Sequence, residues 1–133
     1  MSPGRAVVDT SVLIASESGR AIDESGLPED PVVSVVTLAE LQAGVLAAAD
    51  SDSRARRLAT LDRYSMIEVI DVTEAVAAEW ARLRVHLAEA GWCLNVNDLW
   101  IAASAVAHRL PIVTQDDDFD SLDGVRGLVV VKV

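Results

Sequence analysis

The sequence predicts an α/β fold in three layers, with a central, mainly parallel sheet of about five short strands between helices. Short apolar, β-branched runs alternate along the chain with longer segments of helical spacing. These runs lack the polar alternation of a half-exposed strand, which indicates a sheet covered on both faces. The chain has 133 residues, enough for one hydrophobic core, so we expect a single domain over residues 1–133.

The first half of the chain begins with a β-branched strand at residues 5–8, which ends at Asp9. Thr10 and Ser11 are expected to cap the helix that follows. The next segment is polar and contains two glycines and two prolines, which predicts a partly helical stretch and then a loop. The elements expected after Asp9 are a short helix from residue 12, the polar segment 16–31, a strand at 32–36 and a helix at 37–49.

The second half begins with a helix whose polar positions are largely arginine. A long helix starting at Asp71 or Thr73 is expected to end at Gly91, and Asn95 or Asn97 is expected to cap the helix after it. The helices expected here span residues 51–64, residue 71 or 73 to about residue 90, and residues 98–109. The strands span 66–70, 112–114 and 128–131, and an acidic turn spans 116–118.

Composition excludes several classes of protein. Cys93 is the only cysteine, so no intramolecular disulfide can form, which fits a reducing cytoplasm. Neither a signal peptide nor an apolar run of the roughly 20 residues needed to cross a membrane is visible. The formal net charge of −10 argues against nucleic-acid binding through a general basic surface, but it suits a protein that pairs with a basic partner.

Four carboxylates fall where this fold would gather them. Asp9 ends the first strand and Asp116 lies two residues past strand 112–114, and ligands of parallel sheets bind beyond the carboxyl ends of strands. Glu40 shares a helical face with Val36, Ala43, Gly44 and Ala47, and Asp98 shares one with Ile101, Ala102, Ala105 and Val106. An acid on a core-facing stripe of small apolar residues is unusual, because desolvating an unpaired carboxylate is costly.

Each acid also has a plain structural interpretation. Asp98 suits the first turn of a helix on electrostatic grounds, and Glu40 suits an exposed helix position. Asp116 suits a turn, whereas Asp9 has no ordinary reason to end a strand. Taken together, the four favour a shared site, and four gathered carboxylates require cations. Oxygen ligands of this kind favour Mg²⁺ or Mn²⁺, which could activate water against a phosphodiester.

Four short motifs follow one another in order along nearly the whole chain. They are the segments 8–12 (Val-Asp-Thr-Ser-Val), 37–41 (Thr-Leu-Ala-Glu-Leu) with Gly44, 97–103 (Asn-Asp-Leu-Trp-Ile-Ala-Ala) and 114–119 (Thr-Gln-Asp-Asp-Asp-Phe). Each motif is weak alone, but the ordered set is specific. By these motifs the chain resembles the PIN-domain nucleases, and within them the VapC toxins of bacterial type II toxin–antitoxin pairs.

The resemblance implies a PIN-like fold and a Mg²⁺- or Mn²⁺-dependent endoribonuclease that cuts RNA to inhibit translation and growth. By position, the metal-binding catalytic residues would be Asp9, Glu40, Asp98 and Asp116. Thr114 and Ser11 match the family's supporting hydroxyls. Asp117 and Asp118 stand beside Asp116, which leaves the fourth acid open, and Asp118 would be a supporting or helix-capping residue.

The resemblance also implies a homodimer and a VapB-type antitoxin that offers a basic side chain to the acidic cleft. Trp80, Trp92 and Trp100 are candidates for the surface that the antitoxin covers, although core packing is the more ordinary role for Trp100. Arg54, Arg56 and Arg57 could hold RNA phosphates, although such a run more often marks a solvated helix face.

Two alternatives remain at this stage. One is a Mg²⁺-dependent phosphoryl-transfer or receiver-type domain. A dehalogenase-like phosphatase needs a second acid where Ser11 stands, and a receiver needs a lysine better placed than Lys132. The other is a PIN-like binding module that does not cut, but such a module would usually have lost one of the four acids.

Overall fold

Short runs of valine and isoleucine form the central sheet. The computed structural model describes residues 2–133, and in this part of the chain the sheet has five strands in the order β3-β2-β1-β4-β5. Every neighbouring pair is parallel, as the sequence predicts. The strands are β1 (Arg5–Val8), β2 (Asp30–Ser34), β3 (Glu68–Ile70), β4 (Ile112–Thr114) and β5 (Val130–Lys132).

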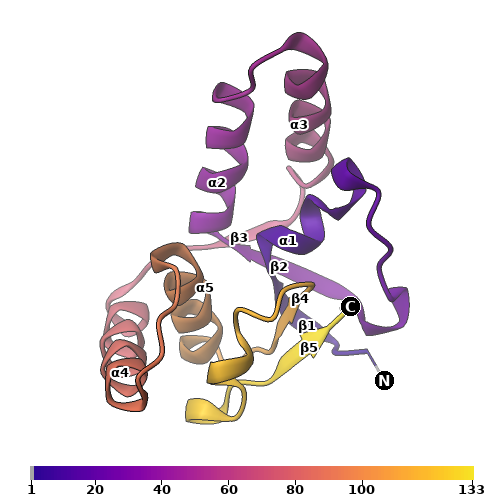
Figure 1. The fold of residues 1–133 in the computed structure, drawn as a ribbon. Coiled ribbons are helices and arrows are strands. Elements are labelled where there is room, and N and C mark those ends of the chain that lie inside the picture. The colour runs from indigo at the N-terminus through magenta and orange to yellow at the C-terminus, as the bar shows by residue number, and fades with distance from the viewer. Residues whose placement is uncertain (1) are drawn as a thin grey trace.

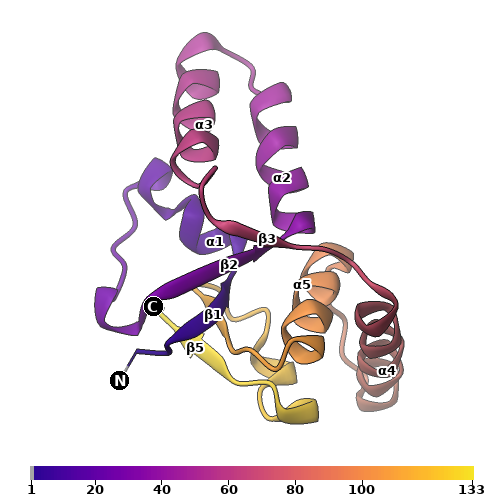
Figure 2. The ribbon, with the colours of Figure 1, turned by 180° about the vertical axis from the view of Figure 1, so that it is seen from behind.

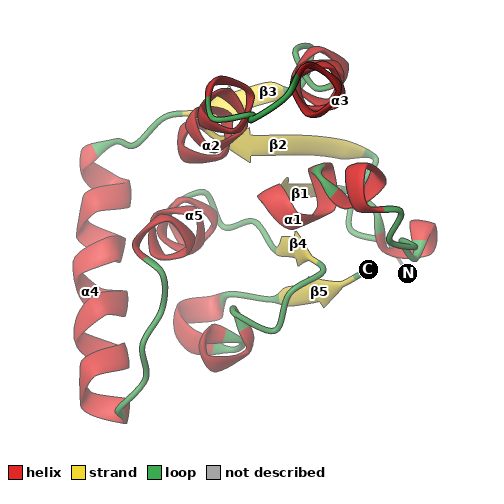
Figure 3. Cartoon of the chain, turned by 45° about the horizontal axis from the view of Figure 1, so that its top comes forward, coloured by secondary structure: helices red, strands yellow, loops and turns green. Residues whose placement is uncertain are grey.

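Helices cover both faces of the sheet (Figures 1 and 2). Figure 3 shows α5 beside the strands and α4 beyond it, whereas α1 lies at the opposite face. The α-helices are α1 (Thr10–Leu13), α2 (Val35–Leu46), α3 (Ser51–Arg63), α4 (Glu74–Ala90) and α5 (Val96–Ala107). Short 3-10 helices are η1 (Ala15–Ser18), η2 (Glu24–Gly26), η3 (Asp120–Leu122) and η4 (Val125–Gly127).

The alternation of side chains along β1 divides the core into two halves. Val7 packs with buried residues of α4 and α5, whereas Ala6 and Val8 pack with α1 and the base of α2. The same division separates Ile112 from Val113 in β4. Successive strand residues point to opposite faces, so both faces of these strands are buried. The predicted three-layer fold is confirmed.

Several boundaries differ from those the sequence predicts. The second strand ends at Ser34 rather than residue 36, because the Ser34 hydroxyl accepts a hydrogen bond from Val36 N (3.1 Å) and starts α2 there. The third strand begins at Glu68, and Met66 is 93% exposed. The last strand begins at Val130 rather than residue 128, because Leu128 is still bonded to the η4 turn.

Helices α2 and α3 form a hairpin that extends away from the sheet, the α2–α3 arm (residues 35–63) (Figures 1 and 2). This arm explains why the expected core-facing stripe around Glu40 is wrong. Ala43 and Ala47 are exposed, and the buried residues of α2 are Thr37 and Leu41. The stripe around Asp98 is confirmed, because Ile101, Ala102 and Ala105 are fully buried.

Candidate metal centre

The centre begins where β1 ends. Asp9 follows the strand directly, and its side chain caps α1 by accepting a hydrogen bond from Ser11 N (3.3 Å). The predicted caps, Thr10 and Ser11, instead lie inside that helix, because Asp9 already has the extended backbone that a cap requires. A buried strand followed at once by a helix N-terminus holds Asp9 with only 3% of its surface exposed.

Two hydroxyls fix the orientation of Asp9. Ser11 Oγ donates to Asp9 Oδ2 over 2.6 Å, and Thr114 Oγ1 donates to the same oxygen over 3.0 Å. Within residues 2–133, Asp9 Oδ1 receives no hydrogen bond, so it is available to a cation. These hydrogen bonds hold the carboxylate in one orientation, which suits a metal ligand.

The same hydroxyls connect β1 to the turn after β4. Ser11 Oγ accepts a hydrogen bond from Gln115 N (3.1 Å), and Thr114 Oγ1 accepts one from Asp116 N (3.1 Å). The backbone of Asp9 is joined to the same strand, because Asp9 N donates to Val113 O (2.9 Å). The parallel register of β1 and β4 therefore brings Asp9 and Asp116 to one edge of the sheet, as expected.

Glu40 is positioned by two threonines. Thr10 Oγ1 donates to Glu40 Oε1 over 2.8 Å, and Thr37 Oγ1 lies 3.1 Å from the Thr10 hydroxyl. Thr37 precedes Glu40 by three residues, so both side chains lie on one face of α2. Sequence reasoning missed Thr10 as a site residue, although its place beside Asp9 was the available signal.

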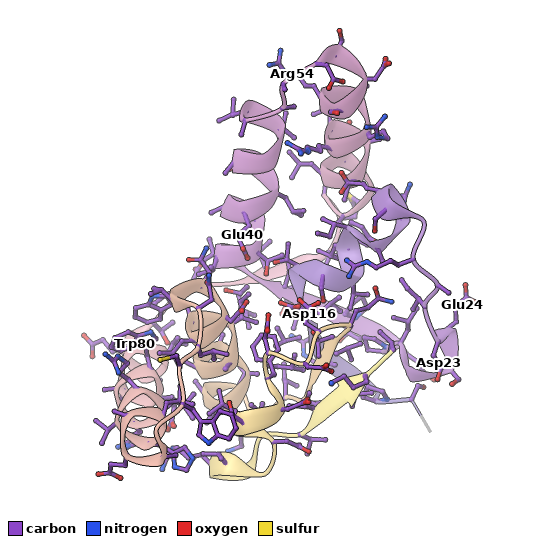
Figure 4. The ribbon with its side chains drawn as sticks, viewed as in Figure 1. Asp23, Glu24, Glu40, Arg54, Trp80 and Asp116 are labelled. Carbon is purple, nitrogen blue, oxygen red and sulfur yellow. The ribbon has the colours of Figure 1, made fainter. Side chains whose placement is uncertain are left out.

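Asp98 lies in the first turn of α5, whose N-cap is Asn95. Burial first, and then the charges of the neighbouring carboxylates, raise the pKa of the Asp98 carboxyl to about 7; these carboxylates are Asp9, Asp118, Glu40 and Asp116. The other three predicted acids and Asp118 therefore lie close enough for their charges to act on Asp98. Each of the four predicted acids comes from a different element or turn of the chain, and Figure 4 shows Glu40 at the base of the α2–α3 arm and Asp116 nearer the sheet.

The structure separates the three aspartates of the acidic turn. Burial, followed by the charges of Asp9 and Asp118, raises the pKa of the Asp116 carboxyl, and Arg20 partly offsets this rise. Asp117 instead forms an ion pair with Lys132, which lowers the pKa of Asp117. Asp118 is exposed and does not cap η3, whose N-cap is Phe119. Asp116 is therefore better placed than Asp117 to join the cluster.

Arg20 is a second residue that sequence reasoning missed. Its Nη1 lies 4.0 Å from Asp116 Oδ1, and its other nitrogens donate to Ser18 Oγ (3.1 Å) and Ser11 O (3.4 Å). Arg20 therefore brings a cation to the edge of an anionic cluster. It lies in a polar segment with no periodicity, so nothing in the sequence pattern indicated it.

The donor set fits a divalent cation by its chemistry. The gathered groups are all carboxylates, the ligands that Mg²⁺ and Mn²⁺ prefer, and one of them is costly to ionise without a counter-charge. Across residues 2–133, no group of three or more Asp, Glu, His or Cys side chains is arranged so that it could hold a metal ion. The carboxylates repel one another, which keeps them apart. To bind Mg²⁺, their oxygens would have to move closer together, until each ligand oxygen lies roughly 2.1 Å from the ion.

A cleft of about 530 Å³ opens beside Asp98 and Asp118. It is also lined by Asp117 and Asp120, and by Trp92, which is 58% exposed. The other two tryptophans stack on each other instead, since the Trp80 and Trp100 rings lie 5.0 Å apart. Of the three tryptophans considered for an antitoxin surface, Trp92 is thus the exposed one. In the described part of the chain, no helix is long and apolar enough to cross a membrane.

Comparisons with known proteins agree with the fold. The family model described as PIN domain matches residues 6–125. Ribonuclease VapC5 of Mycobacterium tuberculosis is 52% identical over 132 residues, which covers 99% of this chain and 98% of the relative. Ribonuclease VapC4 of the same organism is 40% identical, covering 98% of this chain and 100% of the relative.

A solved structure gives the same result. The crystal structure of VapBC-5 from Mycobacterium tuberculosis, a member of the VapBC family of toxin–antitoxin systems, superimposes with a TM-score of 0.92. The sequence identity is 50%, and the match covers 98% of this chain and 100% of that chain. Identity of this level over nearly the full length indicates a common family as well as a common fold.

Proposed function

Since the chain belongs to the PIN-domain family, we propose that it is a metal-dependent endoribonuclease, the toxin of a type II toxin–antitoxin pair. Two relatives that match nearly the full length are named ribonucleases VapC5 and VapC4. The reaction would be hydrolysis of RNA phosphodiester bonds, with inhibition of translation and growth as its consequence.

The observation that carries the proposal is the state of Asp98. It is half-buried beside four other carboxylates, and its pKa of about 7 reflects burial first and their charges second. A protein retains such an arrangement at a cost in stability, so clustered acids of this kind mark functional sites. The catalytic and metal-binding residues in this proposal are Asp9, Glu40, Asp98 and Asp116, with Mg²⁺ as the cofactor and Mn²⁺ as its substitute.

The remaining residues of the centre orient these acids. Ser11 and Thr114 both donate to Asp9 Oδ2 and leave Oδ1 for the metal. Thr10 does the same for Glu40, because its bond to Oε1 leaves Oε2 free within the described residues. Asp118 would supply further negative charge beside Asp98 and Asp116. A divalent cation held here would polarise a phosphodiester and promote attack by water.

The chain's own residues also limit where RNA can approach. Asp9 is nearly inaccessible, so a phosphate would reach the centre over Glu40, Asp98 and Asp116, which are partly exposed. Arg20 stands next to Asp116 and could contact a non-bridging phosphate oxygen. A cation among acids is needed, because the phosphate and the carboxylates would otherwise repel each other.

The partner would be a VapB-type antitoxin, and the chain would form a homodimer. The solved relative that shares 50% of the sequence comes from a VapBC toxin–antitoxin complex. A net charge of −10 suits a partner that inserts a basic side chain into the acidic centre. We further propose that residues 1–133 act as one domain and that the protein works in the cytoplasm, where its RNA substrate would lie.

The test is RNA cleavage by the purified chain and by Asp98→Asn, with Mg²⁺, with Mn²⁺ and with EDTA. Wild type should cut RNA only when a divalent ion is added, and the variant should lose cleavage while keeping its circular dichroism spectrum. Equal cleavage by a folded Asp98→Asn protein would refute the assignment of the centre. Cleavage that persists in EDTA would refute its dependence on metal.

A further inference from the structure

The positive charge of this acidic protein is concentrated on one helix. Helix α3 carries four arginines and two aspartates, so its formal charge is +2 in a chain of −10. Among residues 2–133, these arginines form no ion pair: Arg54, Arg56, Arg57 and Arg63. The cations that do form ion pairs lie elsewhere: Arg5, Arg20, Arg82, Arg126 and Lys132.

A cleft of about 640 Å³ joins this helix to the metal centre. One end is formed by Thr10 and Glu40, which belong to the centre, and the other by Ser53, Arg56 and Arg57 of α3. The wall between them includes Arg20, Glu17, Ser18, Ile14, Leu41 and Gly44. Figure 4 shows that Glu40 lies at the base of the α2–α3 arm and that Arg54 lies at its tip.

Two of the arginines in the cleft are already held in place. Arg57 Nη1 donates to Gly44 O over 2.7 Å, so its half-buried guanidinium is fixed across the two helices of the arm; within residues 2–133 its other N–H groups make no hydrogen bond. Arg20 is held by Ser18 Oγ and Ser11 O. A guanidinium fixed before binding loses little conformational freedom when it contacts a phosphate. Arg56 is exposed, and among the described residues its side chain is hydrogen-bonded only to Ser53 Oγ (3.2 Å).

The opposite charge lines the other cleft that reaches the centre. That cleft contains Asp98, Asp117, Asp118 and Asp120, which would repel a polyanion. A single strand bound at the centre would therefore follow the arginines rather than the aspartates.

We propose that the cleft along the α2–α3 arm holds the RNA backbone on one side of the cut site, with Arg56 and Arg57 contacting successive phosphates and Arg20 contacting the phosphate nearest the centre. This inference rests on the proposed ribonuclease function and adds the path of the substrate. It also explains how a protein of charge −10 binds RNA, since attraction is confined to one cleft.

The test measures binding separately from cleavage. A fluorescent single-stranded RNA of random sequence is titrated with the full chain in EDTA at several salt concentrations. The variants are Arg56→Gln with Arg57→Gln, Arg57→Lys, and Arg84→Gln as the matched control. Arg84 is exposed on α4, away from the arm, and forms no ion pair among residues 2–133.

The double variant should bind RNA roughly tenfold more weakly, as expected for the removal of two arginine–phosphate ion pairs, one exposed and one partly buried. The slope of log affinity against log salt should fall by about 0.7 for each phosphate that the variant no longer neutralises. Arg57→Lys should be intermediate, because it keeps the charge without the fixed fork of donors. Arg84→Gln should bind like wild type, and all variants should keep their melting temperatures within a few degrees.

Three results would overturn the inference. The first is an unchanged RNA affinity in the double variant, and the second is an equal decrease of RNA affinity in Arg84→Gln. The third is competition by poly-glutamate as strong as that by unlabelled RNA at equal charge, which would make the cleft a site for an acidic peptide. Cleavage with Mn²⁺ is scored separately. If the wild type cuts RNA and the double variant binds RNA normally, only the proposed RNA path is refuted. If binding depends on the arginines but no metal supports cleavage, only the proposed ribonuclease function is refuted.

Discussion

Thr114 Oγ1 donates a hydrogen bond to Asp9 Oδ2 over 3.0 Å, although the two residues are 105 positions apart in the sequence. The same hydroxyl accepts a hydrogen bond from Asp116 N. One side chain at the end of β4 therefore orients the carboxylate at the end of β1 and the backbone of the acidic turn. The hydroxyl is fully buried, so water cannot replace it.

Thr114→Val should weaken the metal centre. The change keeps the shape of the side chain but removes the donor to Asp9 and the acceptor for Asp116 N. Removing a supporting hydrogen bond of this kind typically lowers metal affinity or activity roughly 10- to 100-fold. Mn²⁺ affinity measured by calorimetry should fall by this amount. Thr114→Ser keeps the hydroxyl and should recover most of it, and a serine variant as weak as the valine variant would show that packing, not hydrogen bonding, is responsible.

The parts of this site that were predictable from sequence are those tied to strand ends. A β-branched run followed by an acid places Asp9 and Asp116 at one sheet edge, because parallel strands share that edge. The buried stripe of Ile101, Ala102 and Ala105 likewise turns Asp98 toward the core side of α5.

What was not predictable depends on how elements pack. Periodicity gives Glu40 a helix face, but it does not reveal that α2 leaves the sheet as an arm, so the stripe of Ala43 and Ala47 is exposed rather than buried. Arg20 and Thr10 gain their roles from neighbours distant in sequence, Asp116 and Glu40. Arg20 lies outside any helix or strand, and the four-residue helix that contains Thr10 is too short to show a periodic pattern, so neither contact could be predicted from periodicity.

Thr10→Val should act on the centre through Glu40. Thr10 Oγ1 is hydrogen-bonded to Glu40 Oε1 and to the Thr37 hydroxyl, and within the described residues it is not bonded to Asp9. We expect cleavage to fall by roughly tenfold, the lower end for a supporting hydrogen bond, with an unchanged melting temperature in EDTA. Thr10→Ser is the control and should keep wild-type cleavage. A stronger defect than that of Glu40→Gln would contradict a role that acts only through Glu40.

Asp98→Asn should stabilise the metal-free protein at pH 8. The Asp98 pKa is about 7 in the folded chain against an ordinary 3.8, so folding favours the protonated form. The stability that this proton brings is fully present below about pH 4 and is lost as pH rises through about 7. Asparagine resembles the protonated acid and should avoid that loss.

The gain should be on the order of 1 to 2 kcal/mol at pH 8, after discounting for the partial exposure of the side chain. It should disappear near pH 4, and urea unfolding in EDTA at both pH values measures it. Asp117→Asn is the control. Its pKa is lowered by Lys132, so this variant should show no gain at pH 8. Equal stability of wild type and Asp98→Asn at pH 8 would mean that Asp98 is not desolvated among like charges.

Metal affinity should depend on pH over the range in which Asp98 titrates. Below about pH 7 a cation must displace the proton from the Asp98 carboxyl, whereas above about pH 7 this carboxyl is already ionised. Mn²⁺ affinity of the wild type should therefore fall by about tenfold per pH unit below 7 and level off above it. Calorimetry between pH 5.5 and 8.5 checks this, where about one proton should be released per ion at the acidic end. An affinity independent of pH would exclude Asp98 as a ligand.

Asp116→Asn and Asp117→Asn should behave differently although they are neighbours. Asp116 shares the field of Asp9 and Asp118, so its removal should lower metal-dependent cleavage by at least roughly 100-fold, as for removal of a metal ligand. Asp117 is exposed and paired with Lys132, so its variant should cut like wild type and lose little stability. Single-turnover cleavage with Mn²⁺ compares the two. The reverse ranking would place Asp117 in the centre. The ion pair with Lys132 would then have to open whenever metal binds.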